Sequence, residues 1–233
     1  MAALSLTDLH AYYGKAHVLQ GVSITVPSGQ IVGLFGRNGV GKTTLLRSVM
    51  GLGTTVTGRI ALDHTDLSAI TADQRAVRGL GYMPQGTRVF RDLTVEENYR
   101  VAAYSVTSPR PLDSIVEMIP ELREWLARPA GRLSGGQQQL VSLMRSLAAN
   151  CSFLMMDEPT EGLMPAMVER IAEVAKAVAA TGLGVLLVEQ SLLLGEAVCD
   201  QIHLMEKGRI VGTGTFGELS SSGALARALG ISH

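Results

Sequence analysis

The stretch GRNGVGKT, residues 36–43, restricts the possible folds of this chain more than any other segment. It fits the pattern G-x-x-x-x-G-K-[S/T], follows the apolar run QIVGLF, and precedes the helix-like segment KTTLLRSVM, which Gly51 closes as a C-terminal cap. Glycines such as Gly36, Gly39 and Gly41 let backbone N–H groups turn toward phosphate oxygens, and the helix N-terminus adds positive potential. A chance glycine turn would have to match every fixed position and this context, so we predict a phosphate-binding P-loop.

The polar residues of this loop predict ATP as the ligand and Mg²⁺ as its ion. Lys42 would bring a positive charge to the β- and γ-phosphates, and the Thr43 hydroxyl would ligate Mg²⁺. Asn38 and Thr44 complete the ATP-binding residues that we expect in this loop.

Residues 153–158, FLMMDE, form an apolar run that delivers two carboxylates to its end. Ligands bind at the carboxyl edge of a parallel sheet, so Asp157 is expected to hold Mg²⁺ through a water molecule and Glu158 to orient or deprotonate the attacking water. By itself the pair could equally be two solvated acids at a strand end. The P-loop upstream favours the catalytic interpretation.

Residues 133–137, LSGGQ, carry Ser134 and Gln137 at the spacing of a capping box before an apolar helical stripe. The simple interpretation is a helix start. The same geometry, with Gly135 and Gly136 leaving the helix N-terminus bare, also makes an anion site.

The alternation of strand-like and helix-like segments predicts an α/β fold with a mostly parallel sheet, an antiparallel β-portion and a short helical insertion. We expect one domain over 1–233, with a nucleotide-binding core in 1–84 and 138–233 and a helical subdomain in 85–137. Lys207-Gly208 predicts a two-residue hairpin turn between strands.

Composition argues against several classes of protein. The net charge of −1 and the 4% aromatic content do not favour a nucleic-acid surface. No run approaches the roughly 18 apolar residues of a membrane helix, and the N-terminus lacks a signal-peptide pattern. Cys151 and Cys199 stand apart, without a CxxC motif, which predicts buried or half-buried thiols in a reducing cytosol. Any membrane role would have to come through a partner.

Taken in order, the P-loop, LSGGQ and FLMMDEP, with Gln85 in YMPQ between the first two, resemble the ATP-binding subunit of an ABC transporter over essentially the whole chain. The resemblance implies a P-loop NTPase fold of the RecA-like kind. It also implies two subunits arranged head to tail, in which Ser134, Gly135, Gly136 and Gln137 of one complete the ATP site of the other. The implied partners are a second ATPase subunit, two transmembrane permease subunits and, indirectly, a solute-binding protein. The implied location is cytoplasmic, peripheral on the inner face of the cell membrane.

The resemblance assigns two further residues. Tyr13 matches the aromatic residue that stacks on adenine, although a tyrosine here could instead pack within the β-portion. Gln85 matches the glutamine that senses Mg²⁺ and links the site to the helical insertion, although it could simply be a polar residue that leaves a strand.

Shorter segments, LTVEEN (93–98), DEPTEGLMP (157–165) and LLVEQ (186–190), are similar to the second ATPase subunit of branched-chain amino acid importers and to the related urea and short-amide importers. Most members of the wider family carry an aspartate near Met164 or Pro165, and this chain has none there. Its helical insertion between Gln85 and Ser134 is also short, which would narrow the surface that docks on a membrane partner.

Gln190 stands where the family usually has a histidine that contacts the γ-phosphate. Its amide can donate a hydrogen bond but cannot become cationic or pass a proton. If Glu158 is the base, glutamine suffices and both sites of a dimer hydrolyse ATP; if the imidazole matters, this subunit builds a slower site. The similar importers also carry glutamine, which favours the first outcome. Gln190 could also be a helix-entry residue without a ligand.

Three functions compete at this point. An energy-coupling importer ATPase fits all the motifs. A soluble ABC-type ATPase acting on ribosomes or DNA usually has two fused ATPase domains, long coiled coils or basic arms, none of which this sequence contains. A non-catalytic ATP-gated clamp would lack Glu158, which is present. We therefore expect an importer ATPase, paired preferably with a different ATPase subunit, while the sequence leaves its solute open.

Overall fold

A six-stranded sheet with the order β10-β9-β3-β8-β7-β6 forms the centre of the fold. The computed structural model describes residues 2–104 and 106–230. The strands of the central sheet are β3 (Ile31–Phe35), β6 (Leu80–Met83), β7 (Phe153–Asp157), β8 (Gly184–Glu189), β9 (Gln201–Glu206) and β10 (Arg209–Gly214). Neighbouring strands are parallel except β10, which pairs antiparallel with β9.

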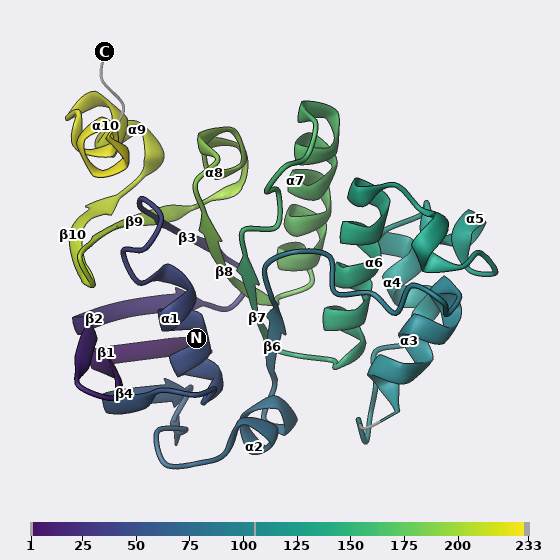
Figure 1. Ribbon diagram of the computed structural model, residues 1–233, viewed down its shortest axis with the longest axis horizontal. Coiled ribbons are helices and arrows are strands. Elements are labelled where there is room, and N and C mark those ends of the chain that lie inside the picture. The colour runs from purple at the N-terminus through teal and green to yellow at the C-terminus, as the bar shows by residue number, and fades with distance from the viewer. Residues whose placement is uncertain (1, 105, 231–233) are drawn as a thin grey trace.

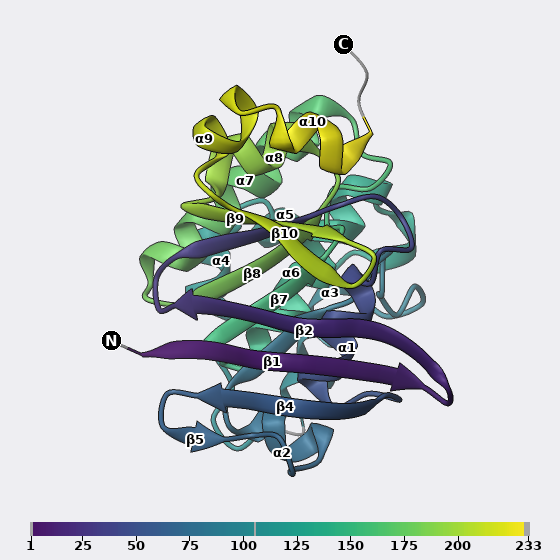
Figure 2. The ribbon, with the colours of Figure 1, turned by 90° about the vertical axis from the view of Figure 1, so that its left-hand side faces the viewer.

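A second, antiparallel sheet lies beside the first, with the order β2-β1-β4-β5. Figure 2 shows its long strands stacked one below the other across the face of the molecule. The long strands are β1 (Ala3–Tyr13), β2 (Ala16–Pro27) and β4 (Thr55–Leu62), and the short β5 (Thr65–Asp66) pairs with β4. The two sheets confirm the expected α/β class with a mostly parallel sheet and an antiparallel portion.

The helices are distributed around these sheets, and α3 to α6 gather on the side away from the antiparallel sheet (Figure 1). Their bounds are α1 (Lys42–Met50), α2 (Ala72–Val77), α3 (Val95–Ala103), α4 (Leu112–Met118), α5 (Leu122–Trp125), the 3₁₀ turn η1 (Ala130–Arg132), α6 (Gly135–Ala148), α7 (Pro165–Ala180), α8 (Leu192–Val198), α9 (Phe216–Ser221) and α10 (Ala224–Leu229). None of these described helices is long and apolar enough to cross a bilayer.

Two large apolar cores hold the layers together, and a third, smaller one packs α9 and α10 against β9. One large core joins α1 to the antiparallel sheet and to one face of the central sheet, through fully buried side chains such as Leu45 and Leu186. The other joins α6 and α7 to the opposite face and to the helical segment that follows β6. The free thiols Cys151 and Cys199 are buried and half-buried, as expected. Burial raises the pKa of Cys151 to about 11 and that of Cys199 to about 12.

Local sequence signals explain how several elements begin and end. Helix α1 starts directly after Gly41, whose φ of 115° is in the left-handed region, and ends at Gly51 with φ 75°. The predicted turn is confirmed, because Lys207 and Gly208 join β9 to β10 with φ values of 46° and 77°. The division into a core and a helical subdomain stays a prediction, and α6 runs without interruption across its boundary at residue 137.

Candidate nucleotide-binding site

The loops that follow the parallel strands meet at one edge of the central sheet and enclose a cavity of about 240 Å³. The P-loop follows β3, Glu158 follows β7, and Gln85 lies beyond the end of β6. The cavity is lined by Val18, Asn38, Gly39, Gly41, Lys42, Thr43, Thr44, Gln85 and Glu158. Apart from Gly36, the sequence-predicted residues of the P-loop therefore share one cavity with Gln85, predicted to sense Mg²⁺, and Glu158, predicted to activate the attacking water.

Glycine suits each of these P-loop positions for a different physical reason. A Cβ on Gly36 would stand 2.4 Å from the Met205 carbonyl oxygen, so the loop passes against β9 only because no side chain is present. Gly41 needs its positive φ to start α1. Gly39 has a φ of 78°, and a Cβ there would meet no atom within 4 Å. That free space at a left-handed loop position suits a phosphate group held by backbone N–H groups.

Lys42 is buried, with only 4% of its surface exposed. Its Nζ donates to the Gly36 carbonyl at 2.8 Å and to the Arg37 carbonyl at 3.2 Å, and lies 3.3 Å from Glu158 Oε1. A buried ammonium group needs such partners because its charge is costly to desolvate. Phosphate oxygens that enter the cavity would offer the same ammonium stronger, charged acceptors.

Asp157 is fully buried at the end of β7 and accepts hydrogen bonds on both carboxylate oxygens. The Thr43 hydroxyl donates to Oδ1 at 3.2 Å, and the Tyr82 phenol donates to Oδ2 at 3.2 Å. Burial raises the pKa of Asp157 although both hydrogen bonds oppose the shift. A hydroxyl and a carboxylate side by side are the hard oxygen donors that Mg²⁺ prefers. The donor set therefore fits the ion that accompanies ATP.

Two glutamine side chains converge on the Glu158 carboxylate. Gln85 Nε2 donates to Oε2 at 3.1 Å, and Gln190 Nε2 donates to Oε1 at 2.9 Å. Gln190 Nε2 also lies 2.6 Å from Asn38 Oδ1, which ties β8 to the P-loop. Glu158 itself has a φ of 48°, an uncommon value for a residue with a side chain. Gln190 is thus a side-chain partner of Glu158 and not merely a residue at the entry of α8.

The sequence analysis missed three residues, Tyr82, Glu161 and Glu189, that form hydrogen bonds with the residues of this site. Tyr82 contacts Asp157, and Glu161 Oε2 accepts from Gln85 Nε2 at 3.0 Å. The buried Glu189 accepts from the Thr160 backbone N–H at 3.0 Å and from the Gln190 backbone N–H at 2.9 Å. Glu189 therefore fixes the loop after β7 relative to Gln190. The one sequence signal for Tyr82 and Glu189 is that each lies near the end of a strand that leads to the site.

The LSGGQ residues begin α6 as predicted but do not line this cavity. Ser134 Oγ accepts from the Gln137 backbone N–H at 3.3 Å, and Gln137 Oε1 accepts from the Ser134 backbone N–H at 2.9 Å. A Cβ on Gly136 would press on the Met167 side chain, at 2.6 Å, whereas a Cβ on Gly135 would meet no atom within 4 Å. The capping box is confirmed, and the helix end is open at Gly135.

Tyr13 lies at the end of β1, is 40% exposed, and is not among the residues that line the cavity. Its predicted stacking on adenine stays a prediction. At the start of α7, Met164 is 77% exposed and Pro165 is the first helical residue. A side chain at position 164 therefore projects into solvent, where the family aspartate would otherwise stand.

Comparison with known proteins identifies relatives along almost the whole chain. It is 36% identical to the probable branched-chain amino acid transport ATP-binding protein LivF of Archaeoglobus fulgidus over 93% of both chains. It is 34% identical to the branched-chain amino acid transport protein BraG of Pseudomonas aeruginosa, over 89% of this chain and 91% of the relative. It is also 36% identical to the lipopolysaccharide export ATP-binding protein LptB of Escherichia coli, over 92% and 91%.

The fold has close structural counterparts. The ADP conformation of MJ1267, an ATP-binding cassette of an ABC transporter, superposes with a TM-score of 0.87 at 26% identity over 98% of both chains. Residues 19–161 match the family model described as ABC transporter. The expected P-loop NTPase fold is confirmed, and the chain belongs to the ABC transporter family as one of its ATP-binding ATPase subunits.

Proposed function

We propose that this protein binds Mg²⁺–ATP and uses its hydrolysis to drive a membrane importer, for branched-chain amino acids or for urea and short amides. The observation that carries the proposal is the shared cavity of Lys42 and Glu158, with Asp157 hydrogen-bonded to Thr43 beside it. Mg²⁺, when bound, would neutralise charge on the phosphates. Thr43 and Asp157 would hold it, with Gln85 as the residue that senses it.

The role of Glu158 follows from its partners. Gln85 and Gln190 donate one amide hydrogen bond to each carboxylate oxygen, which orients the group without taking its charge. A carboxylate fixed in this way is suited to orient or deprotonate the attacking water. Gln190 needs no proton chemistry for that task, which supports the view that glutamine is adequate at this position and that the site hydrolyses ATP.

The open helix end at Gly135 supports assembly with a second ATPase subunit. The LSGGQ residues do not line the cavity of their own chain, and the capping box uses the backbone N–H groups of Ser134 and Gln137 but not those of Gly135 and Gly136. The two glycine N–H groups are therefore available to the ATP held by a partner. We favour a heterodimer with a different ATPase subunit, since the similar importers use two distinct ATPases. ATP binding would close the dimer and hydrolysis would reopen it.

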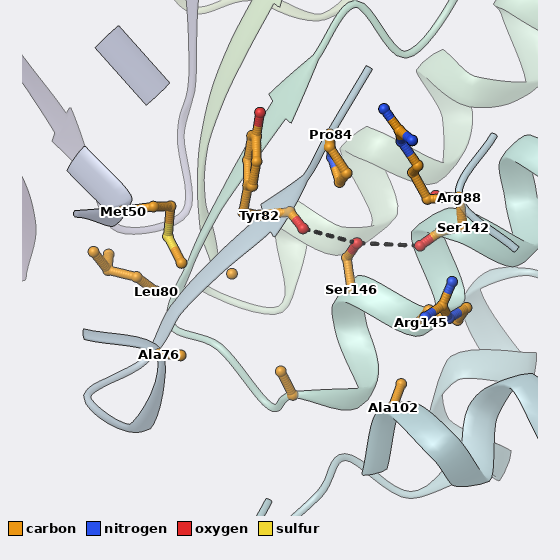
Figure 3. Close-up of a pocket in the computed structure, with 12 residues that line it drawn as sticks. Met50, Ala76, Leu80, Tyr82, Pro84, Arg88, Ala102, Ser142, Arg145 and Ser146 are labelled. Carbon is orange, nitrogen blue, oxygen red and sulfur yellow. Dashed lines mark hydrogen bonds between the residues drawn. The ribbon is translucent and has the colours of Figure 1, made fainter. Parts of the chain in front are cut away.

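Family members work with transmembrane permeases, and a groove of about 360 Å³ is our candidate for the docking surface. It lies between β6 and α6, and its walls include Met50, Leu80 and Pro84 (Figure 3). Arg88 and Arg145 stand on the side of the helical segment. We infer that a cytoplasmic segment of a permease occupies this groove, which would place the protein on the inner face of the membrane through its partners.

The nature of the solute rests on the relatives. LivF and BraG are named for branched-chain amino acid transport, which supports an importer. LptB is named for lipopolysaccharide export and is equally similar in sequence, which makes export the alternative. Uptake of labelled leucine and urea in cells with and without this chain separates the two. Loss of either uptake supports the importer, whereas normal uptake with a defect in the outer membrane would support export.

The first experiment is Mg²⁺–ATP hydrolysis by the purified chain over a range of protein concentrations, with Gln190→Ala alongside. We expect the rate per subunit to rise with concentration if two copies can pair. Gln190→Ala should lower that rate at least tenfold, because it removes the Gln190 amide contact to Glu158. An unchanged rate would show that Glu158 needs no such support. A wild type that binds ATP but stays inactive at every concentration would show that the partner ATPase is required.

A further inference from the structure

Tyr82 occupies a place that neither the P-loop chemistry nor the LSGGQ helix accounts for. It lies on β6, which pairs with β7 so that Met83 is opposite Met156. Its phenol donates to Asp157 Oδ2 at 3.2 Å, on the oxygen that Thr43 does not contact. The two hydroxyls therefore hold the carboxylate from opposite oxygens.

The other end of Tyr82 is attached to α6. Its backbone carbonyl accepts a hydrogen bond from Ser146 Oγ at 3.3 Å, and Ser146 Oγ also contacts the Ser142 carbonyl at 3.1 Å (Figure 3). Tyr82 also lines the groove beside Met50, Leu80 and Pro84. One residue thus contacts the predicted magnesium ligand, the helix that begins at Ser134 and the groove.

We propose that Tyr82 is a positioning residue that holds the Asp157 carboxylate in the orientation that magnesium needs. Through Tyr82, a partner segment bound in the groove would change the orientation of that carboxylate. The proposal rests on the function proposed above. With Oδ2 held by the phenol, the carboxylate cannot rotate freely, so Oδ1 stays beside Thr43. A permease segment that packs in the groove would press on the Tyr82 side chain and its backbone, and would thereby act on the orientation of Asp157.

The phenol is also suited to a purely orienting task. Burial, together with the neighbouring Asp157 carboxylate, raises the pKa of Tyr82 well above its ordinary value. An ordinary phenol already keeps its proton at neutral pH, so the hydroxyl remains a donor. Groups that hydrogen-bond to metal ligands typically contribute 10- to 100-fold to metal affinity.

The direct test is Mn²⁺ binding to the full chain with ADP, followed by electron paramagnetic resonance, because Mn²⁺ can stand in for Mg²⁺ without turnover. We expect Tyr82→Phe to weaken Mn²⁺ binding about tenfold, while ADP binding without metal is unchanged. Tyr99→Phe is the matched control, since it removes a phenol hydrogen bond to the Arg110 carbonyl, of 2.9 Å, outside the cavity. It should leave Mn²⁺ binding as it is.

Asp157→Asn separates failure of this proposal from failure of the proposed function. If Asp157→Asn abolishes Mn²⁺ binding while Tyr82→Phe binds normally, the role of Tyr82 is wrong and the metal role of Asp157 stands. If Asp157→Asn also binds normally, both roles are wrong. Should Tyr82→Phe fail to fold, Tyr82→Met offers an apolar side chain without the hydroxyl and should show the same tenfold loss.

The groove is tested in the complex with the permeases at saturating Mg²⁺. We expect Tyr82→Phe to lower the stimulation of hydrolysis by the permeases at least threefold, and Tyr99→Phe to leave it unchanged. Equal stimulation in both variants would overturn the transmission from groove to metal ligand.

Discussion

Glu158 is held by more contacts than a solvated acid at a strand end would be, since two amides and the Lys42 ammonium surround its carboxylate. Replacement by glutamine keeps the size and removes the basicity. We expect Glu158→Gln to lower Mg²⁺–ATP hydrolysis by about 100-fold or more while ATP binding is retained, because a positioned general base contributes about 10²–10⁴ in rate. Single-turnover hydrolysis and nucleotide binding, measured together, check this.

Glu161→Gln is the matched control for that variant. Glu161 also accepts from Gln85 but does not line the cavity, so its replacement should change hydrolysis by less than about threefold. If Glu158→Gln hydrolyses ATP within fivefold of the wild-type rate, another group activates the water.

Without a bound ligand, the buried carboxylate of Asp157 should lower the free energy of unfolding of the protein. Burial raises its pKa in the folded state, so folding takes up a proton in the interval between the ordinary and the raised value. The contribution of Asp157 to the free energy of unfolding is therefore greatest below the ordinary carboxyl pKa and is lost as the pH rises through the raised one. At neutral pH, without metal or nucleotide, we expect Asp157→Asn to raise the melting temperature by about 2–4 °C, or about 1 kcal/mol.

The pH dependence distinguishes this effect from a change in packing. The gain of Asp157→Asn should shrink in acid, where the wild-type carboxyl is protonated. Mg²⁺–ADP should reverse the order, because it stabilises the wild type more than the variant that lacks the metal ligand. A lower melting temperature for the variant at pH 8 without ligand would contradict the prediction.

At the scale of elements, α6 and α3 begin with the same device. Ser134 with Gln137 and Thr94 with Glu97 each form a complete capping box. Ser134→Ala and Thr94→Ala should each lower the free energy of unfolding by about 1 kcal/mol, as loss of a cap does. Only Ser134→Ala should also reduce hydrolysis, because only its helix end is expected to face a partner's ATP. Urea unfolding and turnover distinguish the two, and an equal loss of turnover would reduce Ser134 to a cap.

The elements that sequence predicts best are those with local signals. The P-loop, the capping box at Ser134 and the Lys207–Gly208 turn each depend on residues a few positions apart. Contacts such as Tyr82 with Asp157 depend on which strands become neighbours, and β6 and β7 are separated by the whole helical segment. The sequence therefore predicted the residues of the cavity except Val18, and it predicted Gln190 beside them, but it missed the contacts of Tyr82, Glu161 and Glu189. Helices α2, α9 and α10 are short and were not expected.

At the scale of the whole molecule, the central question is whether one chain contains a complete ATP site. Side-chain hydrogen bonds join the P-loop to Asp157 through Thr43, and to Gln190 and then Glu158 through Asn38, whereas the LSGGQ residues lie outside the cavity. The motifs predicted this division only through resemblance to the family, since spacing along the chain does not reveal which residues meet within a subunit and which meet between subunits. The open space at Gly135 makes that question accessible to a single substitution.

Gly135→Ala should separate folding from assembly. Its Cβ meets no atom within 4 Å, and alanine favours a helix over glycine by up to about 1 kcal/mol, so the isolated chain should be as stable as the wild type or slightly more so. The added methyl group would stand at the helix end that a partner's phosphate must approach. We expect hydrolysis to fall at least tenfold, while ATP binding by the single chain is unchanged because its P-loop is intact.

Gly217→Ala is the control, since Gly217 also lies in the first turn of a helix, α9, with free space for a Cβ. If both variants hydrolyse ATP at the wild-type rate, a partner's phosphate does not come close to Gly135. The LSGGQ residues would then serve only to start α6.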